Sequence, residues 1–156
     1  MIALTIPGFG ALELAHLVLD YNGTLAVDGH LLPGVRDALS TLAEKLEVHV
    51  ITADTFGRAG IELAGLPVNL TVIGETDQAE AKLAHVERLG PERVLAIGNG
   101  RNDRKMLAAA AIGIAVAQGE GAAAKTIASA DVVVGGIVEA LDLLLEPKRL
   151  IATLRS

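Results

Sequence analysis

Short apolar runs alternate with longer amphipathic stretches along almost the whole chain. The runs are rich in leucine and β-branched residues, and most are apolar at consecutive positions rather than at every second one. Consecutive apolar positions are typical of strands that are covered on both faces, as in a parallel sheet. We therefore predict strands at Leu14–Leu19, Val48–Thr52, Val68–Ile73, Val94–Ile97, Ile112–Val116 and Asp131–Val134.

The stretches between these runs are predicted to be helices, because their connections are rich in Gly, Pro, Asn and Asp. The predicted helices are Val35–Leu46, Phe56–Ala64, Gln78–Leu89, Asp103–Ala110, Gly121–Ala128 and Ile137–Leu145. Strands and helices that alternate in this way form βαβ units with right-handed crossovers. The pattern predicts an α/β fold in three layers, with an open, mostly parallel sheet between two layers of helices.

Two short segments depart from this alternation. Met1–Ile6, followed by a turn at Pro7 and Gly8, is predicted to fold back beside the first central strand. Val27–His30 is predicted to be a tight hairpin, because its Asp-Gly pair favours the positive φ angles of such turns. No internal repeat or low-complexity linker divides the chain, so we predict one domain over residues 1–156.

Composition excludes several classes of protein. The chain has no cysteine, which excludes disulfide scaffolds and cysteine-ligated metal centres. A net charge of −6 and 2% aromatic residues argue against nucleic acid as a partner. The most apolar stretch, Leu107–Ala117, is too short to span a bilayer, and no basic segment precedes the apolar N-terminal residues. We expect a cytoplasmic protein with neither a nucleic-acid nor a membrane partner.

Polar residues that a core would not tolerate follow three of the predicted strands. They lie in the segments Asp20–Leu25, Thr52–Thr55 and Gly98–Asp103. Lys82 lies on the helix that leads into the third of these strands. Because ligands of open α/β sheets bind beyond the carboxyl ends of the strands, we expect these segments to meet there. A carboxylate, a hydroxyl and an ammonium among oxygen-rich loops are typical of phosphoryl-transfer sites with magnesium.

These four segments, taken in order, resemble the four motifs of the haloacid dehalogenase (HAD) superfamily. The variant is most similar to soluble relatives of the phosphorylation domain of P-type ATPases. In that branch the motif lysine stands on the helix just before a Gly-Asp-Gly-x-Asn-Asp loop, as Lys82 does before Gly98–Asp103. The resemblance implies a Rossmann-like HAD fold and a Mg²⁺-dependent phosphatase that forms an aspartyl-phosphate.

The resemblance also implies a role for each matching residue. The catalytic residues would be Asp20 as nucleophile, Thr52 and Lys82. The Mg²⁺ ligands would be Asp20, the main-chain carbonyl of Asn22, Asn99 and Asp103. The phosphate would be held by Asn22, the N–H of Gly23, Thr52, Ala53, Lys82 and Asn102. Thr24 would support the first loop through its hydroxyl.

Two positions depart from the usual pattern. Position 22 is Asn where such phosphatases carry the general acid and base, and an amide does not transfer protons. Loss of this catalysis typically slows a reaction by about 10²- to 10⁴-fold, so hydrolysis is expected to be slow. Asn99 replaces a metal-binding Asp, which weakens Mg²⁺ binding. Both departures leave open an alternative function, a weak or inactive regulatory module that binds phosphate or a metal.

The intervals between the motifs are short, so we expect no cap domain over the site. An open site suits a phosphorylated small molecule or macromolecule, or a homo-oligomer in which a neighbouring subunit covers it. ATP is not expected as the donor, because no separate nucleotide-binding domain is recognisable.

Other polar residues are interpreted as structural. Asp54 or Thr55 is expected to cap the helix that follows, and Gly119–Gly121 to form a turn. His16 and His49 lie within apolar strand runs, and His85 belongs to a polar helix face. His30, in the predicted hairpin, remains an alternative source of the missing acid and base.

Overall fold

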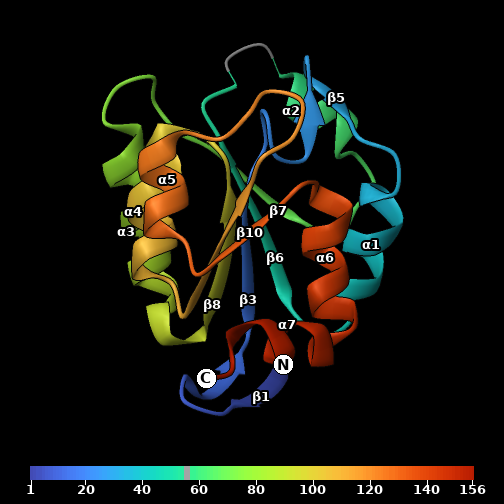
Figure 1. Cartoon of the computed structure of the whole chain (residues 1–156). Coiled ribbons are helices and arrows are strands. Elements are labelled where there is room, and N and C mark those ends of the chain that lie inside the picture. The colour runs from blue at the N-terminus through green and yellow to red at the C-terminus, as the bar shows by residue number, and fades with distance from the viewer. Residues whose placement is uncertain (55–56) are drawn as a thin grey trace.

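A six-stranded sheet runs through the centre of the protein (Figure 1). The computed structural model describes residues 1–54 and 57–156. All neighbouring strands of this sheet are parallel, in the order β10-β9-β8-β3-β6-β7. The strands are β3 (His16–Asp20), β6 (Glu47–Thr52), β7 (Asn69–Val72), β8 (Val94–Gly98), β9 (Ile112–Val116) and β10 (Val132–Val134).

Helices cover both faces of the sheet, as Figure 1 shows: α3, α4 and α5 lie on one face, and α1 and α6 on the other. The helices are α1 (Val35–Leu42), α2 (Arg58–Glu62), α3 (Gln78–Leu89), α4 (Arg104–Ala109), α5 (Ala124–Ser129), α6 (Ile137–Leu145) and α7 (Pro147–Leu154), with short 3₁₀ turns η1 (Pro91–Arg93) and η2 (Arg101–Asp103). The predicted three-layer Rossmann-like fold is therefore confirmed.

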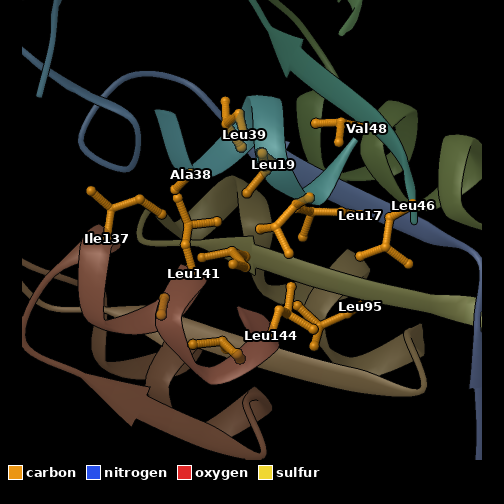
Figure 2. Close-up of a cluster of buried hydrophobic side chains, with 14 of the residues drawn as sticks. Leu17, Leu19, Ala38, Leu39, Leu46, Val48, Leu95, Ile137, Leu141 and Leu144 are labelled. Atoms are coloured by element: carbon orange, nitrogen blue, oxygen red, sulfur yellow. The ribbon is translucent and has the colours of Figure 1, made fainter. Parts of the chain in front are cut away.

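The side chains of β3 alternate between two apolar cores. Leu17 and Leu19 pack with Leu39 of α1 and Leu141 of α6 (Figure 2), whereas Val18 packs on the other face with Val86 of α3. All six of these side chains are fully buried. Burying one such side chain contributes about 1.5–3 kcal/mol to the stability of the fold, so packing on both faces holds β3 in place. The strand that carries Asp20 is thus packed firmly on both faces.

The strand order places a crevice at the end of β3. From β3 the chain continues outward through β6 and β7, and it then crosses to β8, on the other side of β3. Such a switch in direction separates the loops that follow the two central strands, and ligands of open α/β sheets bind in the crevice between them. In the ladder, Asp20 pairs with Ile51, and Leu19 pairs with Ile97. The segments after β3, β6 and β8 therefore start side by side.

The N-terminal strands differ from the prediction. Leu14–Leu19 was predicted as one strand, but Ala15 interrupts it and separates two strands. Leu14 ends β2 (Gly10–Leu14), which pairs antiparallel with β1 (Ile2–Ile6) in a sheet of its own. The prediction that the first strand lies beside the central strand is therefore wrong. The alternating burial of β1 explains the difference, because it is typical of a ribbon with one covered face.

A seventh helix, α7, was not predicted from the sequence. It starts at Pro147, a residue that suits the first turn of a helix, and it contacts β1. Leu150 of α7 is fully buried in the same core as β1. Both ends of the chain lie near the amino ends of the strands (Figure 1): the N–H of Ser156 donates to the carbonyl of Pro7 at 2.9 Å, and the N-terminal amine of Met1 donates to the carbonyl of Lys45, just before β6.

The remaining predicted elements are present with small shifts. α3, α6 and β9 have the predicted bounds. The predicted hairpin forms between β4 (Ala26–Val27) and β5 (His30–Leu31), with positive φ angles at Asp28 and Gly29. α5 begins three residues later than predicted, since Gly121 has a φ of 73°, which a helix does not allow. The predicted start at Phe56 lies outside the described residues.

Within the described part of the chain, none of the helices combines the length and apolar content that crossing a membrane requires. Between Asp20 and β6 the chain forms only β4, β5 and α1. Between Thr52 and Lys82 the described residues form α2, β7 and the start of α3. The described residues of these two intervals form no cap domain, as predicted.

Candidate active site

A polar pocket of about 240 Å³ opens at the carboxyl ends of the central strands. Its lining is drawn from the loops after β3, β6, β8 and β9 and from the start of α3. The structure thereby brings together seven of the predicted site residues: Asp20, Asn22, Thr52, Ala53, Lys82, Asn99 and Asn102. Gln78, Gly100 and Glu120 complete the lining.

Asp20, the last residue of β3, is buried at the base of this pocket. One carboxylate oxygen, Oδ1, accepts a hydrogen bond from Lys82 Nζ at 2.7 Å, and the other accepts one from the Thr24 hydroxyl at 3.1 Å. Burial, followed by the nearby carboxylate of Asp103, raises the pKa of Asp20 to about 7, although Lys82 and Thr24 act in the opposite direction. The ammonium of Lys82 is therefore what favours the ionised carboxylate in this buried position.

Lys82 reaches Asp20 from the buried face of α3. Val86 lies one turn further along the same helix face and packs into the core, which directs Lys82 toward the sheet. Only 1% of the Lys82 side chain is exposed, and its Nζ contacts Asp20 Oδ1 at 2.7 Å and Asp103 Oδ1 at 2.6 Å. Burial acts to lower the pKa of Lys82, but the two carboxylates raise it above its ordinary value. The ammonium consequently stays charged.

Asp103 is fully buried and does not line the pocket. Its Oδ1 accepts from Lys82, and its Oδ2 accepts the N–H groups of Asn99 at 3.0 Å and Gly100 at 2.9 Å. In this arrangement Asp103 positions Lys82 and the loop after β8. Its role as a direct metal ligand stays a prediction. A Cβ at Gly98 would lie 2.5 Å from the Asp103 carboxyl carbon, so this packing requires glycine there.

The backbone of Gly23 closes the turn after β3. Its N–H donates to the carbonyl of Ala26 at 2.8 Å, and its role toward a phosphate stays a prediction. Gly23 has a φ of 79°, and a Cβ there would lie 2.3 Å from the side-chain nitrogen of Asn99. Glycine is therefore needed at this position because of the tight turn and the close approach of Asn99.

Asn99 and Thr24 form a small network beside Asp20. The Thr24 hydroxyl lies 3.1 Å from Asn99 Oδ1, and Asn99 Nδ2 donates to the carbonyl of Gly121 at 3.1 Å. The bond to Gly121 turns the amide so that its oxygen faces Thr24. Thr24 supports the loop, as predicted, and Asn99 presents a neutral oxygen near the nucleophilic carboxylate.

Thr52 and Asn102 lie on the pocket wall, each held by one neighbour. Thr52 Oγ1 accepts the N–H of Asp54 at 3.2 Å, and Asn102 Nδ2 donates to Gln78 Oε1 at 2.6 Å. The carboxylate of Asp54 accepts the N–H of Ala59 in the first turn of α2 at 2.7 Å. The N-cap residue of α2 is Gly57, so the prediction of Asp54 as N-cap is wrong, and Thr55 lies outside the described residues.

Three residues that the sequence analysis left out belong to this region. Gln78 and Glu120 line the pocket, and Gln118 Nε2 donates to the carbonyls of Gly23 and Thr24 at 3.2 and 2.7 Å. Glu120 follows β9, whose carboxyl end lies on the same edge of the sheet as those of β3 and β8. The same argument from strand ends would have found it. His30, by contrast, contacts Glu62 at 3.1 Å and is not part of the lining.

Comparison with known proteins places the chain in a family. Residues 4–111 match the sequence profile of the haloacid dehalogenase-like hydrolases. The uncharacterized protein MJ0073 of Methanocaldococcus jannaschii is 51% identical over 79 residues, which make up 48% of this chain and 85% of that protein. The uncharacterized protein MJ0072 of the same organism is 44% identical over 39 residues, 25% of this chain and 89% of that protein.

Solved structures share the fold. The cobalt-bound deoxy-D-mannose-octulosonate 8-phosphate phosphatase of Haemophilus influenzae superposes with a TM-score of 0.72 at 16% identity, over 92% of this chain and 94% of that one. The 3-deoxy-D-manno-octulosonate 8-phosphate phosphatase of Moraxella catarrhalis was solved with magnesium, phosphate and the sugar acid. It superposes with a TM-score of 0.66 at 21% identity, over 91% of this chain and 94% of that one. The sequence profile covers most of the chain, and the fold agrees with it. This protein belongs to the haloacid dehalogenase-like hydrolase family.

Proposed function

We propose that this protein is a Mg²⁺-dependent phosphohydrolase that forms an aspartyl-phosphate on Asp20. The observation that carries the proposal is the buried contact of 2.7 Å between Lys82 Nζ and Asp20 Oδ1 at the base of the polar pocket. A carboxylate paired with a buried ammonium is held in place for attack on a phosphorus atom. Membership in the hydrolase family and the fold shared with sugar-acid phosphatases support this chemistry.

The donor set beside Asp20 fits Mg²⁺. Asp20, Asn22 and Asn99 line the pocket and offer a carboxylate, a main-chain carbonyl and an amide oxygen, which are the hard ligands that Mg²⁺ prefers. With both carboxylates ionised, the buried charges of Asp20, Asp103 and Lys82 sum to −1, which favours a cation in the pocket. When bound, Mg²⁺ would shield the negative charge of the phosphoryl group from the attacking carboxylate.

The chain's own residues account for the first step. A carboxylate oxygen of Asp20 attacks phosphorus, the bond from phosphorus to the ester oxygen breaks, and the leaving oxygen takes the bonding electrons. Lys82 balances the charge on Asp20 and on the transferring group. We assign Thr52, Ala53 and Asn102 to the phosphoryl oxygens, because all three line the pocket wall.

The second step consumes water. Water attacks phosphorus, the bond to Asp20 breaks, and inorganic phosphate leaves as the carboxylate is restored. The amide of Asn22 does not transfer a proton in either step, so turnover is expected to be slow. Among the described residues that line the pocket, Glu120 carries the carboxylate besides Asp20, and we assign it a part in this proton transfer.

The remaining features of the function rest on the sequence. The kinship with soluble relatives of P-type ATPases stays a prediction, as do the cytoplasmic location and assembly into a homo-oligomer. A pocket of about 240 Å³ holds a phosphoryl group and its nearest atoms, so the rest of a substrate would lie outside it. A phosphorylated small molecule or a phosphorylated macromolecule is therefore the proposed substrate.

Hydrolysis of p-nitrophenyl phosphate by the purified protein, with and without Mg²⁺, tests the proposal. We expect slow, Mg²⁺-dependent turnover that Asp20→Asn abolishes. The matched control is Asp28→Asn, since Asp28 lies on the exposed hairpin turn and Asn tolerates its φ of 53°. Absence of both turnover and phosphoprotein in the unmodified protein would favour the alternative, a regulatory module that binds phosphate or a metal.

A further inference from the structure

Three histidines and a glutamate gather at the end of the sheet opposite the pocket. His16 begins β3 and Glu47 begins β6, and the two are direct partners in the ladder. His49 lies two residues after Glu47, so both side chains point to the same face of the sheet. That face is covered by α3, which contributes His85. The fold thus brings His16, the pair Glu47 and His49, and His85 together from three distant parts of the sequence.

The donor atoms of three of these residues are spaced as metal ligands are. His16 Nδ1 lies 3.3 Å from His49 Nε2 and 3.4 Å from Glu47 Oε2, and His49 Nε2 lies 3.7 Å from Glu47 Oε1. Zinc binds nitrogen and oxygen at about 2.0–2.2 Å, so neighbouring ligands of a tetrahedral ion are about 3.3–3.6 Å apart. Glu47 approaches the two imidazoles with different oxygens, Oε2 toward His16 and Oε1 toward His49. One donor atom from each of the three residues lies within 4.8 Å of the other two, which is close enough for them to share one ion.

Neighbouring residues hold these ligands in place. His49 is buried, and its second nitrogen, Nδ1, lies 3.5 Å from His85 Nε2. Asn69 Nδ2 donates to Glu47 Oε1 at 3.3 Å. Metal-binding histidines usually bond a partner through the other ring nitrogen, which fixes the ring and its tautomer.

We propose that His16, Glu47 and His49 form a second metal site, which binds Zn²⁺ or a similar first-row divalent cation. Two imidazoles and one carboxylate suit such ions, whereas Mg²⁺ prefers oxygen ligands. Three protein ligands leave the fourth position to water. The ion would join the amino ends of β3 and β6, whose carboxyl ends carry Asp20 and Thr52. The site is independent of the proposed phosphatase activity.

Calorimetric titration of the chelator-treated full chain with Zn²⁺, in excess Mg²⁺ that occupies the Asp20 pocket, tests the proposal. We expect one equivalent of Zn²⁺ to bind, and Co²⁺ in its place to give the intense visible bands of tetrahedral coordination. His49→Gln is expected to weaken Zn²⁺ binding by more than ~100-fold, and His85→Gln by about 10- to 100-fold, as for other residues that orient a ligand.

Controls separate this site from others. Glu47→Gln is a second ligand variant that keeps the fold, because 55% of that side chain is exposed, and it is expected to weaken Zn²⁺ binding by more than ~10-fold. His30→Gln, which removes another histidine beside a glutamate, should leave binding unchanged. Asp20→Asn should also leave it unchanged. Zn²⁺ binding that is absent, that resists both His49→Gln and Glu47→Gln, or that is lost in Asp20→Asn would overturn the proposal.

Discussion

At the scale of single residues, Lys82 joins two carboxylates of the site, and its neighbours in sequence do not reveal this role. The order of the motifs singled it out, but a lysine on a polar helix is usually solvated. Its burial between Asp20 and Asp103 follows from the packing of Val86, a contact between distant parts of the chain. Sequence could name the residue, whereas only the fold shows that its charge balances two buried carboxylates.

Replacing Lys82 tests this balance. Lys82→Met leaves two buried carboxylates unpaired, and breaking a buried ion pair typically costs about 3–5 kcal/mol in the free energy of unfolding. Urea denaturation of metal-free protein measures the change. The double variant Lys82→Met, Asp103→Asn should regain part of the loss, because one of the unpaired charges is then absent. A Lys82→Met protein as stable as the unmodified one would contradict the proposed charge balance.

Restoring a carboxylate at position 22 tests the cause of slow turnover. Asn22→Asp supplies a proton-transfer group in the pocket, so dephosphorylation should become faster by up to about 10²- to 10⁴-fold. Rapid-quench measurement of phosphoprotein decay follows this step directly. Asn22→Ala is the control, since it removes the amide without adding an acid and should give no gain. An unchanged rate in Asn22→Asp would show that proton transfer does not limit decay.

Glu120 is tested by the opposite change. Glu120→Gln keeps the shape of the side chain and removes its ability to transfer a proton, so decay of the phosphoprotein should slow by at least about 10-fold. Glu139→Gln is a suitable control, because Glu139 belongs to α6, outside the pocket lining. Equal decay rates in the two variants would remove Glu120 from the proposed mechanism.

At the scale of helices and strands, the pattern of apolar residues predicted the sheet well and its N-terminal additions poorly. The consecutive apolar positions of β9 and the amphipathic period of α3 and α6 fixed their bounds, because burial on both faces or on one stripe leaves few alternatives. The antiparallel pairing of β1 with β2 was not predicted, since it depends on which strand is nearest in space. Likewise, α7 is short, and only its contact with β1 gives its apolar residues a place to pack.

The packing of α7 can be measured by truncating one side chain. Leu150 is fully buried, so Leu150→Ala should lower the free energy of unfolding by about 2–5 kcal/mol, as large-to-small changes in cores do. Leu145→Ala, at the end of α6, is the matched control because Leu145 is 36% exposed, and a much smaller loss is expected. Similar losses in the two variants, measured by chemical denaturation, would mean that α7 adds little to the core.

At the scale of the whole molecule, the parallel sheet explains which part of the site could be predicted. Segments that follow parallel strands meet at one edge, which correctly brought Asp20, Thr52 and the loop after β8 together. For Gly23 and Asp103 the folded loops add hydrogen bonds that the sequence did not predict: the Gly23 N–H donates to Ala26, and Asp103 accepts from Lys82 and from the N–H of Asn99. Which donor pairs with which acceptor depends on the folded loops, and spacing in sequence does not encode it.

Ligand binding should stabilise the molecule as a whole. Beryllium fluoride with Mg²⁺ mimics a phosphoryl group on a carboxylate, and a ligand at 100 times its dissociation constant adds about 2.7 kcal/mol to the free energy of unfolding. Scanning calorimetry should therefore show a higher Tm for the unmodified protein and for Asp28→Asn. Asp20→Asn should show no such rise, and a rise in that variant would place the complex elsewhere.

The position of the first and last described residues has a practical consequence. Both lie near the amino ends of the strands (Figure 1), whereas the pocket opens at the carboxyl ends. A molecule tethered to a solid support through either of these residues would present its pocket to the surrounding solution. Large phosphorylated partners could then be captured on such a support without obstruction from the attachment.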